Sequence, residues 1–198
     1  MSLRSCLSIT IGAGMLFAAT PSFASLTWPT NDLAAQGAAK HCADAAAVAI
    51  ADKNVTDADV AKCTKAAKLV DFDGDRAAAL SNRSVLNIQR ADYNAAIADS
   101  TAALKFDGRL VEAVVNRGAA YLAMHRAGEA VADFDRALTM TPVHAEKIYF
   151  NRAMAREDMG DLKGAYADYA RAAQLAPKWD QPKQQMNRFT IRDRRPIS

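Results

Sequence analysis

The sequence of residues 116–142 is NRGAAYLAMHRAGEAVADFDRALTMTP. Its opening Asn-Arg pair also occurs at residues 82–83 and 151–152, so the pair recurs at spacings of 34 and 35 residues. The residues that keep this register in the two later units are Gly118, Tyr121, Ala130, Phe134, Ala137, Pro142, Ala153, Ala165, Tyr169, Ala172 and Pro177. Self-similarity at a period of this length is typical of proteins built from stacked helical units.

The recurring pattern resembles the tetratricopeptide repeat, a helix–turn–helix unit of about 34 residues. The resemblance covers residues 77–177, and its first unit is the least typical because Gly108 stands where proline is expected. The aromatic position before the turn is Tyr121 in one unit but Asn87 and Arg156 in the others. The resemblance implies an all-α fold, a right-handed superhelix of antiparallel helix pairs (an α-solenoid) with a concave groove.

The composition agrees with a helical fold. Alanine is abundant, whereas glycine and proline number only 9 and 6 in 198 residues. Alanine is the best helix former, and scarce glycine and proline disfavour a turn-rich sheet protein. The predicted helices of the repeats are 77–90, 92–106, 111–125, 127–140, 146–159 and 161–175.

The chain divides into segments on this basis. Residues 25–76 are expected to form an N-terminal helical pair, with helices at 33–51 and 56–70, that resembles a degenerate fourth unit. The three repeats are 77–110, 111–145 and 146–178, and residues 179–198 form a C-terminal capping helix and a basic tail.

Residues 1–24 have the features of a secretory signal peptide. Arg4 supplies a positive charge, residues 6–19 are apolar, and small residues precede a predicted cleavage site after Ala24. The apolar run is too short to span a bilayer, which needs roughly 20 residues. Ser25, rather than cysteine, follows the cleavage site, which disfavours a lipoprotein. We therefore expect export across the inner membrane to the periplasm, with no transmembrane segment after signal removal.

Two cysteines remain after the leader, Cys42 and Cys63. An even pair in an exported chain predicts a disulfide. A metal site that includes His41 is disfavoured because no C-x-x-C pair and no fourth ligand accompany it. A redox-active pair is disfavoured because catalytic dithiols usually lie two residues apart.

A second pattern joins arginines to aspartates sixteen residues later. The three pairs are Arg83 with Asp99, Arg117 with Asp133, and Arg152 with Asp168. Each pair places an arginine on the first helix and an aspartate on the second helix of a unit. We favour structural salt bridges over the alternative, a ligand-binding ladder of charges.

The resemblance also indicates a candidate site for a protein or peptide partner. In the family, the sixth position of each first helix faces the groove, and here that position is Asn82, Asn116 or Asn151. Because a carboxamide both donates and accepts, it suits a peptide backbone. Lys147, Phe150 and Met154 complete the expected site. Of the clamp with which chaperone-binding members hold a carboxylate terminus, only Asn116 and Lys147 are matched, so a partly hydrophobic peptide or helix is expected instead.

Motifs for catalysis and for metal or cofactor binding are weak or missing. Residues 71–75 (DFDGD) depart from a calcium loop, since the glycine comes two positions early and Asn82 replaces the bidentate glutamate. The sequence has no HExxH, no GxSxG and no basic stripe with interleaved aromatics for nucleic acid. We expect a non-enzymatic interaction module, a scaffold or adaptor of the cell envelope, without cofactor or metal. The alternative is a self-assembling structural protein, with a possible homo-oligomer, or an accessory subunit of an envelope enzyme complex.

Overall fold

The computed structural model describes residues 33–52, 54–140 and 142–192. The predicted signal peptide and most of the basic tail lie outside this part of the chain. All regular structure in the described part is helical, which confirms the all-α fold. The helices are α1 (Leu33–Asp52), α2 (Asp57–Leu69), α3 (Asp73–Gln89), α4 (Tyr93–Phe106), α5 (Val111–Ala123), α6 (Ala127–Thr139), α7 (Ala145–Asp158), α8 (Leu162–Leu175) and α9 (Asp180–Arg192).

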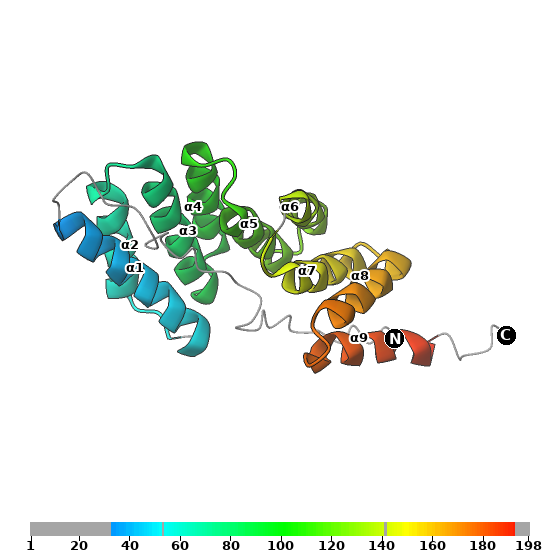
Figure 1. Cartoon of the computed structure of the whole chain (residues 1–198). Coiled ribbons are helices and arrows are strands. Elements are labelled where there is room, and N and C mark those ends of the chain that lie inside the picture. Colours follow the sequence, from blue (N-terminus) through cyan, green and yellow to red (C-terminus); the bar gives the residue numbers. More distant parts are fainter. Residues whose placement is uncertain (1–32, 53, 141, 193–198) are drawn as a thin grey trace, which may run out of the picture.

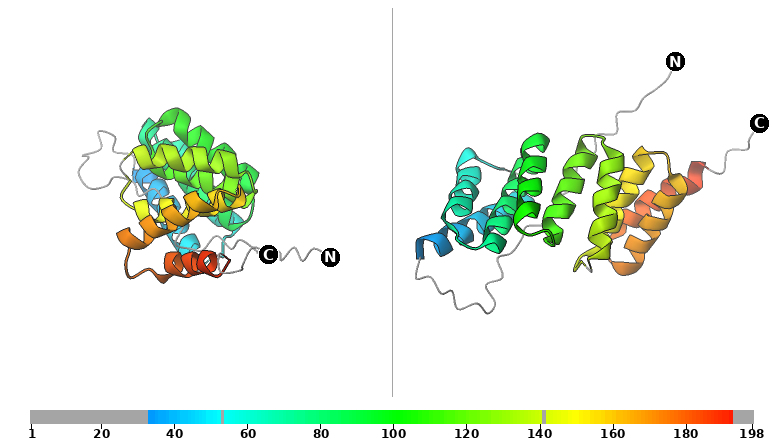
Figure 2. Two further views of the ribbon diagram at one scale, coloured as in Figure 1. Left: turned by 90° about the vertical axis from the view of Figure 1, so that its right-hand side faces the viewer. Right: turned by 90° about the horizontal axis from the view of Figure 1, so that it is seen from above.

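The helices form antiparallel pairs that stack side by side into an elongated solenoid (Figures 1 and 2). Each of the helices from α2 to α8 packs against both of its neighbours in the chain. The first helices of successive units also touch each other, α1 against α3, α3 against α5, and α5 against α7, more closely than the second helices do. The stack therefore curves toward the first helices, and we call the surface of α3, α5 and α7 on that side the concave face.

A repeated backbone turn ends each first helix of the three repeats. One residue in the turn adopts a positive φ, namely Ala91 (60°), His125 (55°) and Gly160 (81°). The next residue donates its backbone N–H five positions back, to the carbonyl of Asn87, Tyr121 or Arg156. This arrangement satisfies carbonyls that the helix end leaves open. The same turn therefore precedes the second helix of each of the three repeats, although only one of the three positive-φ residues is a glycine.

The space between the two helices of a unit is filled differently in the first and second repeats. In the second repeat, the fully buried ring of Phe134 lies against Gly118, where an added β-carbon would be 2.8 Å from Cε1. In the first repeat, a hydrogen bond of 2.9 Å from Ser100 to Ser84 takes that place. A pair of hydroxyls thus fills the space that an aromatic ring fills in the second repeat.

A disulfide joins the two helices of the N-terminal pair. Cys42 of α1 and Cys63 of α2 are bonded, with an S–S distance of 2.09 Å, and both are fully buried. The predicted disulfide is therefore present in the structure. A cross-link that closes a loop of this size stabilises a fold by about 3 kcal/mol, mainly through the unfolded state. The disulfide lies in the unit at the end of the stack, which has a neighbouring unit on one side only.

Helix α9 covers the opposite end of the stack. Trp179, just before α9, lies 4.8 Å from Phe150 between ring centroids, and Phe189 lies 6.1 Å from Tyr169. These contacts shield the aromatic cluster of the last repeat from solvent. Among residues 33–52, 54–140 and 142–192, no helix combines the length and the apolar character that crossing a bilayer requires.

Candidate ligand-binding face

Three arginine–aspartate pairs brace the repeats. In each pair, Nε and Nη2 of the arginine donate to the two carboxylate oxygens of the aspartate, at distances between 2.5 and 2.9 Å. Asp99, Asp133 and Asp168 are only 7%, 6% and 4% exposed. Two parallel charge-assisted bonds to a buried carboxylate fix the crossing of the two helices in each unit.

Each of these arginines also reaches the preceding unit through Nη1. The acceptor is Thr64 of α2 for Arg83, at 3.0 Å, and Asp135 of α6 for Arg152, at 2.5 Å. Arg117 makes a longer contact of 3.5 Å to Thr101 of α4. Arg83 thus contacts α2 in the same way as Arg117 contacts α4 and Arg152 contacts α6.

The pairs also affect the acidity of the arginines. Hydrogen bonds to Asp99 and to Asp133 raise the pKa of Arg83 and of Arg117. For Arg152, burial is the largest single influence and lowers the pKa, but Asp168 and Asp135 together outweigh it, so that the pKa is raised. Because their donors already serve carboxylates inside the stack, these arginines act as braces rather than as an open ladder of charges.

The three asparagines that we expected to face the groove are buried. Asn82, Asn116 and Asn151 are 2%, 0% and 1% exposed, so their carboxamides are not on an open surface. The reason is the close approach of the first helices, since Nδ2 of Asn116 lies 3.3 Å from Oγ of Ser81 across the α3–α5 contact. This hydrogen bond joins two units.

The other expected groove residues are distributed over two environments. Phe150 is 2% exposed because Trp179 and Tyr169 cover it, so it belongs to the core rather than to an open groove. Met154 is partly buried between two core clusters, and Lys147 is partly exposed on α7. Burial thus corrects the expected site: of the six predicted partner-binding residues, Asn82, Asn116, Asn151 and Phe150 are buried.

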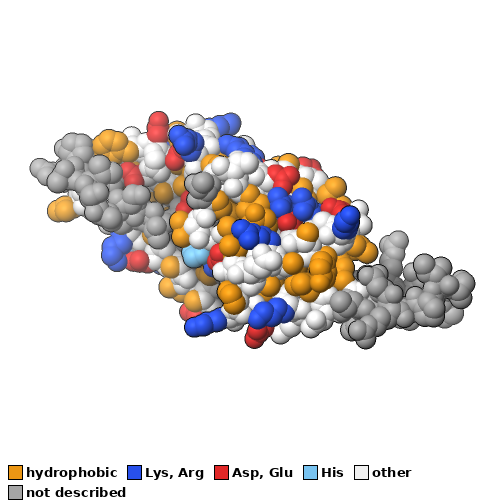
Figure 3. Space-filling view, turned by 45° about the vertical axis from the view of Figure 1, so that its right-hand side comes forward, with side chains coloured by type: hydrophobic (Ala, Val, Ile, Leu, Met, Phe, Trp, Pro, Cys, Tyr) orange, Lys and Arg blue, Asp and Glu red, His pale blue; other side chains and the backbone are white. Residues whose placement is uncertain are grey.

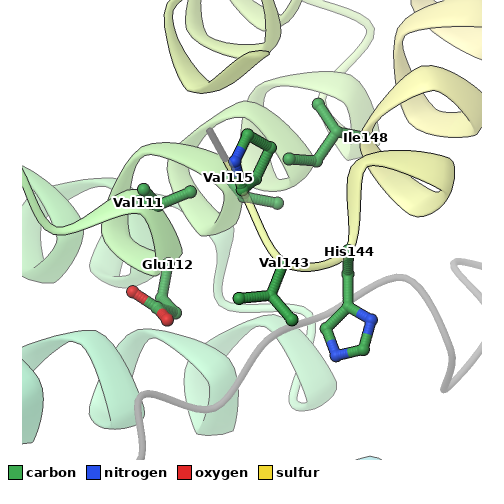
Figure 4. Close-up of a pocket in the computed structure, with 7 residues that line it drawn as sticks. Val111, Glu112, Val115, Val143, His144 and Ile148 are labelled. Atoms are coloured by element: carbon green, nitrogen blue, oxygen red, sulfur yellow. The ribbon is translucent and has the colours of Figure 1, made fainter. Parts of the chain in front are cut away.

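An apolar pocket lies between the second and third repeats and is lined in part by the first helices α5 and α7 (Figure 4). Its cavity volume is about 110 Å³. The lining residues come from the start of α5, the turn before α7, and α7 itself: Val111, Glu112, Val115, Pro142, Val143, His144 and Ile148. The carboxylate of Glu112 and the ring of His144 flank Val143, and Nδ1 of His144 lies 3.2 Å from Glu146.

Val143 is the least covered apolar residue of this pocket, with 91% of its surface exposed. The expected site does not include the turn at residues 142–144, which connects α6 to α7. The available signal was a valine between Pro142 and His144, where a connecting turn usually carries polar residues.

Charges on the molecular surface are mixed. On the face shown in Figure 3, side chains of Lys and Arg alternate with those of Asp and Glu around hydrophobic areas. Within the described residues, no group of three or more His, Cys, Asp or Glu side chains could hold a metal ion.

Stacked antiparallel helix pairs with a pocket between two of the repeats define a helical repeat protein of the solenoid class. A family model described as "Tetratricopeptide repeat" matches residues 146–178. Together with the solved structures below, this match supports the tetratricopeptide repeat family. No curated protein matches the sequence significantly.

Three solved structures of similar fold are tetratricopeptide domains. The Arabidopsis OM64 TPR domain is 25% identical with a TM-score of 0.56, over 59% of this chain and 95% of that one. The first TPR domain of human RPAP3 shares the fold at 23% identity and a TM-score of 0.55, over 58% of this chain and 90% of that one. The first TPR of Spaghetti (RPAP3), bound to the HSP90 peptide SRMEEVD, shares the fold at 22% identity and a TM-score of 0.57, over 62% of this chain and 96% of that one.

Proposed function

We propose that this chain is an exported interaction module that binds a protein or peptide partner on its concave face and acts as a scaffold or adaptor in the cell envelope. The observation that carries the proposal is the apolar pocket between α5 and α7, beside the 91% exposed Val143. An apolar side chain left in water beside an apolar cavity gains free energy when a ligand covers both. A peptide-bound relative of the same fold supports a binding role.

The chemistry of the face favours a ligand with an apolar anchor. The related Spaghetti domain holds a peptide whose sequence ends in EEVD. Here the charged residue that lines the pocket is Glu112, and valine, isoleucine and proline make up most of the rest. A carboxylate at the pocket disfavours an acidic peptide end and leaves burial of an aliphatic or aromatic side chain as the main source of affinity.

Location in the envelope rests on the leader-like residues 1–24 and on the disulfide. Structural disulfides persist in oxidising compartments such as the periplasm. Cys42 and Cys63 are bonded and buried, as expected for a structural cross-link rather than an exchanging dithiol.

A crosslinking pull-down from the envelope fraction tests the binding face. The bait is the chain from Ser25 to Ser198, compared with Val143→Asp and with Val48→Asp, a matched change at a valine of α1 that is 53% exposed. We expect a partner that the wild-type chain and Val48→Asp capture equally and that Val143→Asp captures at least ten-fold less. Circular dichroism first establishes equal helicity of the three baits. Equal capture by all three would move recognition away from the concave face.

A further inference from the structure

We infer that the pocket between α5 and α7 recognises a peptide segment in which an aliphatic side chain has an arginine or a lysine within two residues of it. The aliphatic side chain fills the pocket, and the cation pairs with the carboxylate of Glu112, which is one of the lining residues. This inference rests on the proposed function and deepens it, because it states the chemistry of the partner at the same pocket.

The size of the pocket selects the apolar part of the ligand. Val115 of α5 and Ile148 of α7 line it with fully buried side chains, whereas Val143 at its opening is 91% exposed. The cavity of about 110 Å³ is smaller than an engineered apolar cavity of about 150 Å³ that binds benzene. It therefore suits an aliphatic side chain such as that of valine or leucine and is too small to enclose an indole.

A carboxylate without a partner supplies the charged part of the site. Glu112 is the only acidic residue that lines the pocket within the described part of the chain, and no described lysine or arginine lines it. Among the described residues, no side chain bonds to the carboxylate of Glu112. The other three glutamates of the chain are paired: Glu129 with Arg126, Glu146 with His144, and Glu157 with Arg188.

The position of Glu112 in its helix also has a structural consequence. Glu112 lies in the first turn of α5, where an acidic side chain stabilises the positive end of the helix dipole. Glu129 holds the equivalent place in the first turn of α6, but it is bonded to Arg126 and does not line the pocket. Only the carboxylate of Glu112 lies beside Val143 (Figure 4). Glu129 is therefore the matched control for changes of Glu112.

The spacing of the two parts of the site fits a short peptide. Glu112 and Val115 are three residues apart on α5, so their β-carbons are about 5–6 Å from each other. Successive residues of an extended peptide are about 3.4 Å apart, so neighbouring or next-neighbouring side chains span this distance. An arginine is favoured over a lysine, because its guanidinium donates two parallel bonds to a carboxylate.

Peptide selection followed by titration tests the inference. Phage-displayed random peptides are selected on the chain from Ser25 to Ser198 and counter-selected on Val143→Asp, and the enriched peptide is labelled with fluorescein. We expect enriched peptides to combine an aliphatic residue with an arginine or a lysine within two positions. Glu112→Gln should weaken binding about five-fold or more, whereas Glu129→Gln should leave the Kd unchanged.

A charge exchange provides a readout that partial unfolding cannot produce. Glutamate in place of the cation of the selected peptide should abolish binding to the wild-type chain, because like charges then meet at the pocket. The same peptide should bind Glu112→Lys at least about five-fold more tightly than it binds the wild-type chain. Circular dichroism first establishes equal helicity of Glu112→Gln, Glu112→Lys and Glu129→Gln.

The outcomes separate this inference from the proposed function. Peptides that depend on Val143 but carry no basic residue, or equal binding to Glu112→Gln and the wild-type chain, would overturn the inference and leave partner capture on this face standing. A selection that returns no peptide dependent on Val143 would also overturn the inference. So would a dimer in sedimentation that Val143→Asp dissociates, because a second copy of the chain would then fill the pocket. Equal partner capture by the three baits of the pull-down would overturn the proposed function itself.

Discussion

Replacing Phe134 by alanine lowers the free energy of unfolding by about 3–5 kcal/mol, the usual cost of deleting a buried aromatic ring. The ring is fully buried and lies between the two helices of the second repeat, against Gly118. In a stack, each unit depends on its neighbours, so a cavity in the central repeat weakens the packing on both sides. Urea denaturation followed by circular dichroism measures the loss.

The matched control is Phe106→Ala, at a phenylalanine of α4 that is 40% exposed. This change should lower the free energy of unfolding by only about 1 kcal/mol, because less apolar area returns to water. Equal losses at Phe134 and Phe106 would contradict the assignment of the repeat core. Gly118→Ala should cost about 1–3 kcal/mol in the wild-type chain, since its β-carbon would press on the ring, and less in a Phe134→Leu background.

The second large effect is expected for Arg117→Ala, which should lower the free energy of unfolding by about 3 kcal/mol. The substitution leaves the carboxylate of Asp133 buried, at 6% exposure, without the two bonds that now satisfy it. Removing one partner of a buried pair costs more than the pair itself contributes, because an uncompensated charge remains. Denaturation midpoints, compared at equal m-value, give the loss.

Two comparisons make this prediction specific. The double variant Arg117→Met with Asp133→Leu should recover most of the stability, since no buried charge is then left. Arg126→Ala breaks the exposed pair with Glu129 and should cost far less than Arg117→Ala. If Arg117→Ala lowered the free energy of unfolding as little as Arg126→Ala does, the arginine–aspartate pairs would not stabilise the stack.

Most of the helices could be predicted from the sequence because their signals are local. The expected helix at 111–125 is observed as Val111–Ala123, and that at 161–175 as Leu162–Leu175. Helix α3 starts four residues earlier than expected, at Asp73, since the backbone N–H of Arg76 bonds to the carbonyl of Phe72. The positive-φ turn was not predicted, because Ala91 and His125 give no glycine signal there.

The candidate site was harder to predict because exposure is a property of the packed stack. The repeat register locates Asn116 on the first helix, but only the neighbouring helix, through Ser81, determines that its carboxamide is buried. Phe150 is buried by Trp179, which lies outside the repeat altogether. The pocket depends on Val143 in a connecting turn that the repeat pattern does not describe.

We expect the partner to contact the concave face, and mass spectrometry of amine crosslinks in the captured complex tests this expectation most directly. Lys147 lies on α7, a first helix, whereas Lys62, Lys105 and Lys163 lie on the second helices α2, α4 and α8. Crosslinks from the partner should fall on Lys147 and be lost with Val143→Asp. Crosslinks confined to Lys62, Lys105 and Lys163 would place the partner on the outer surface and contradict the account.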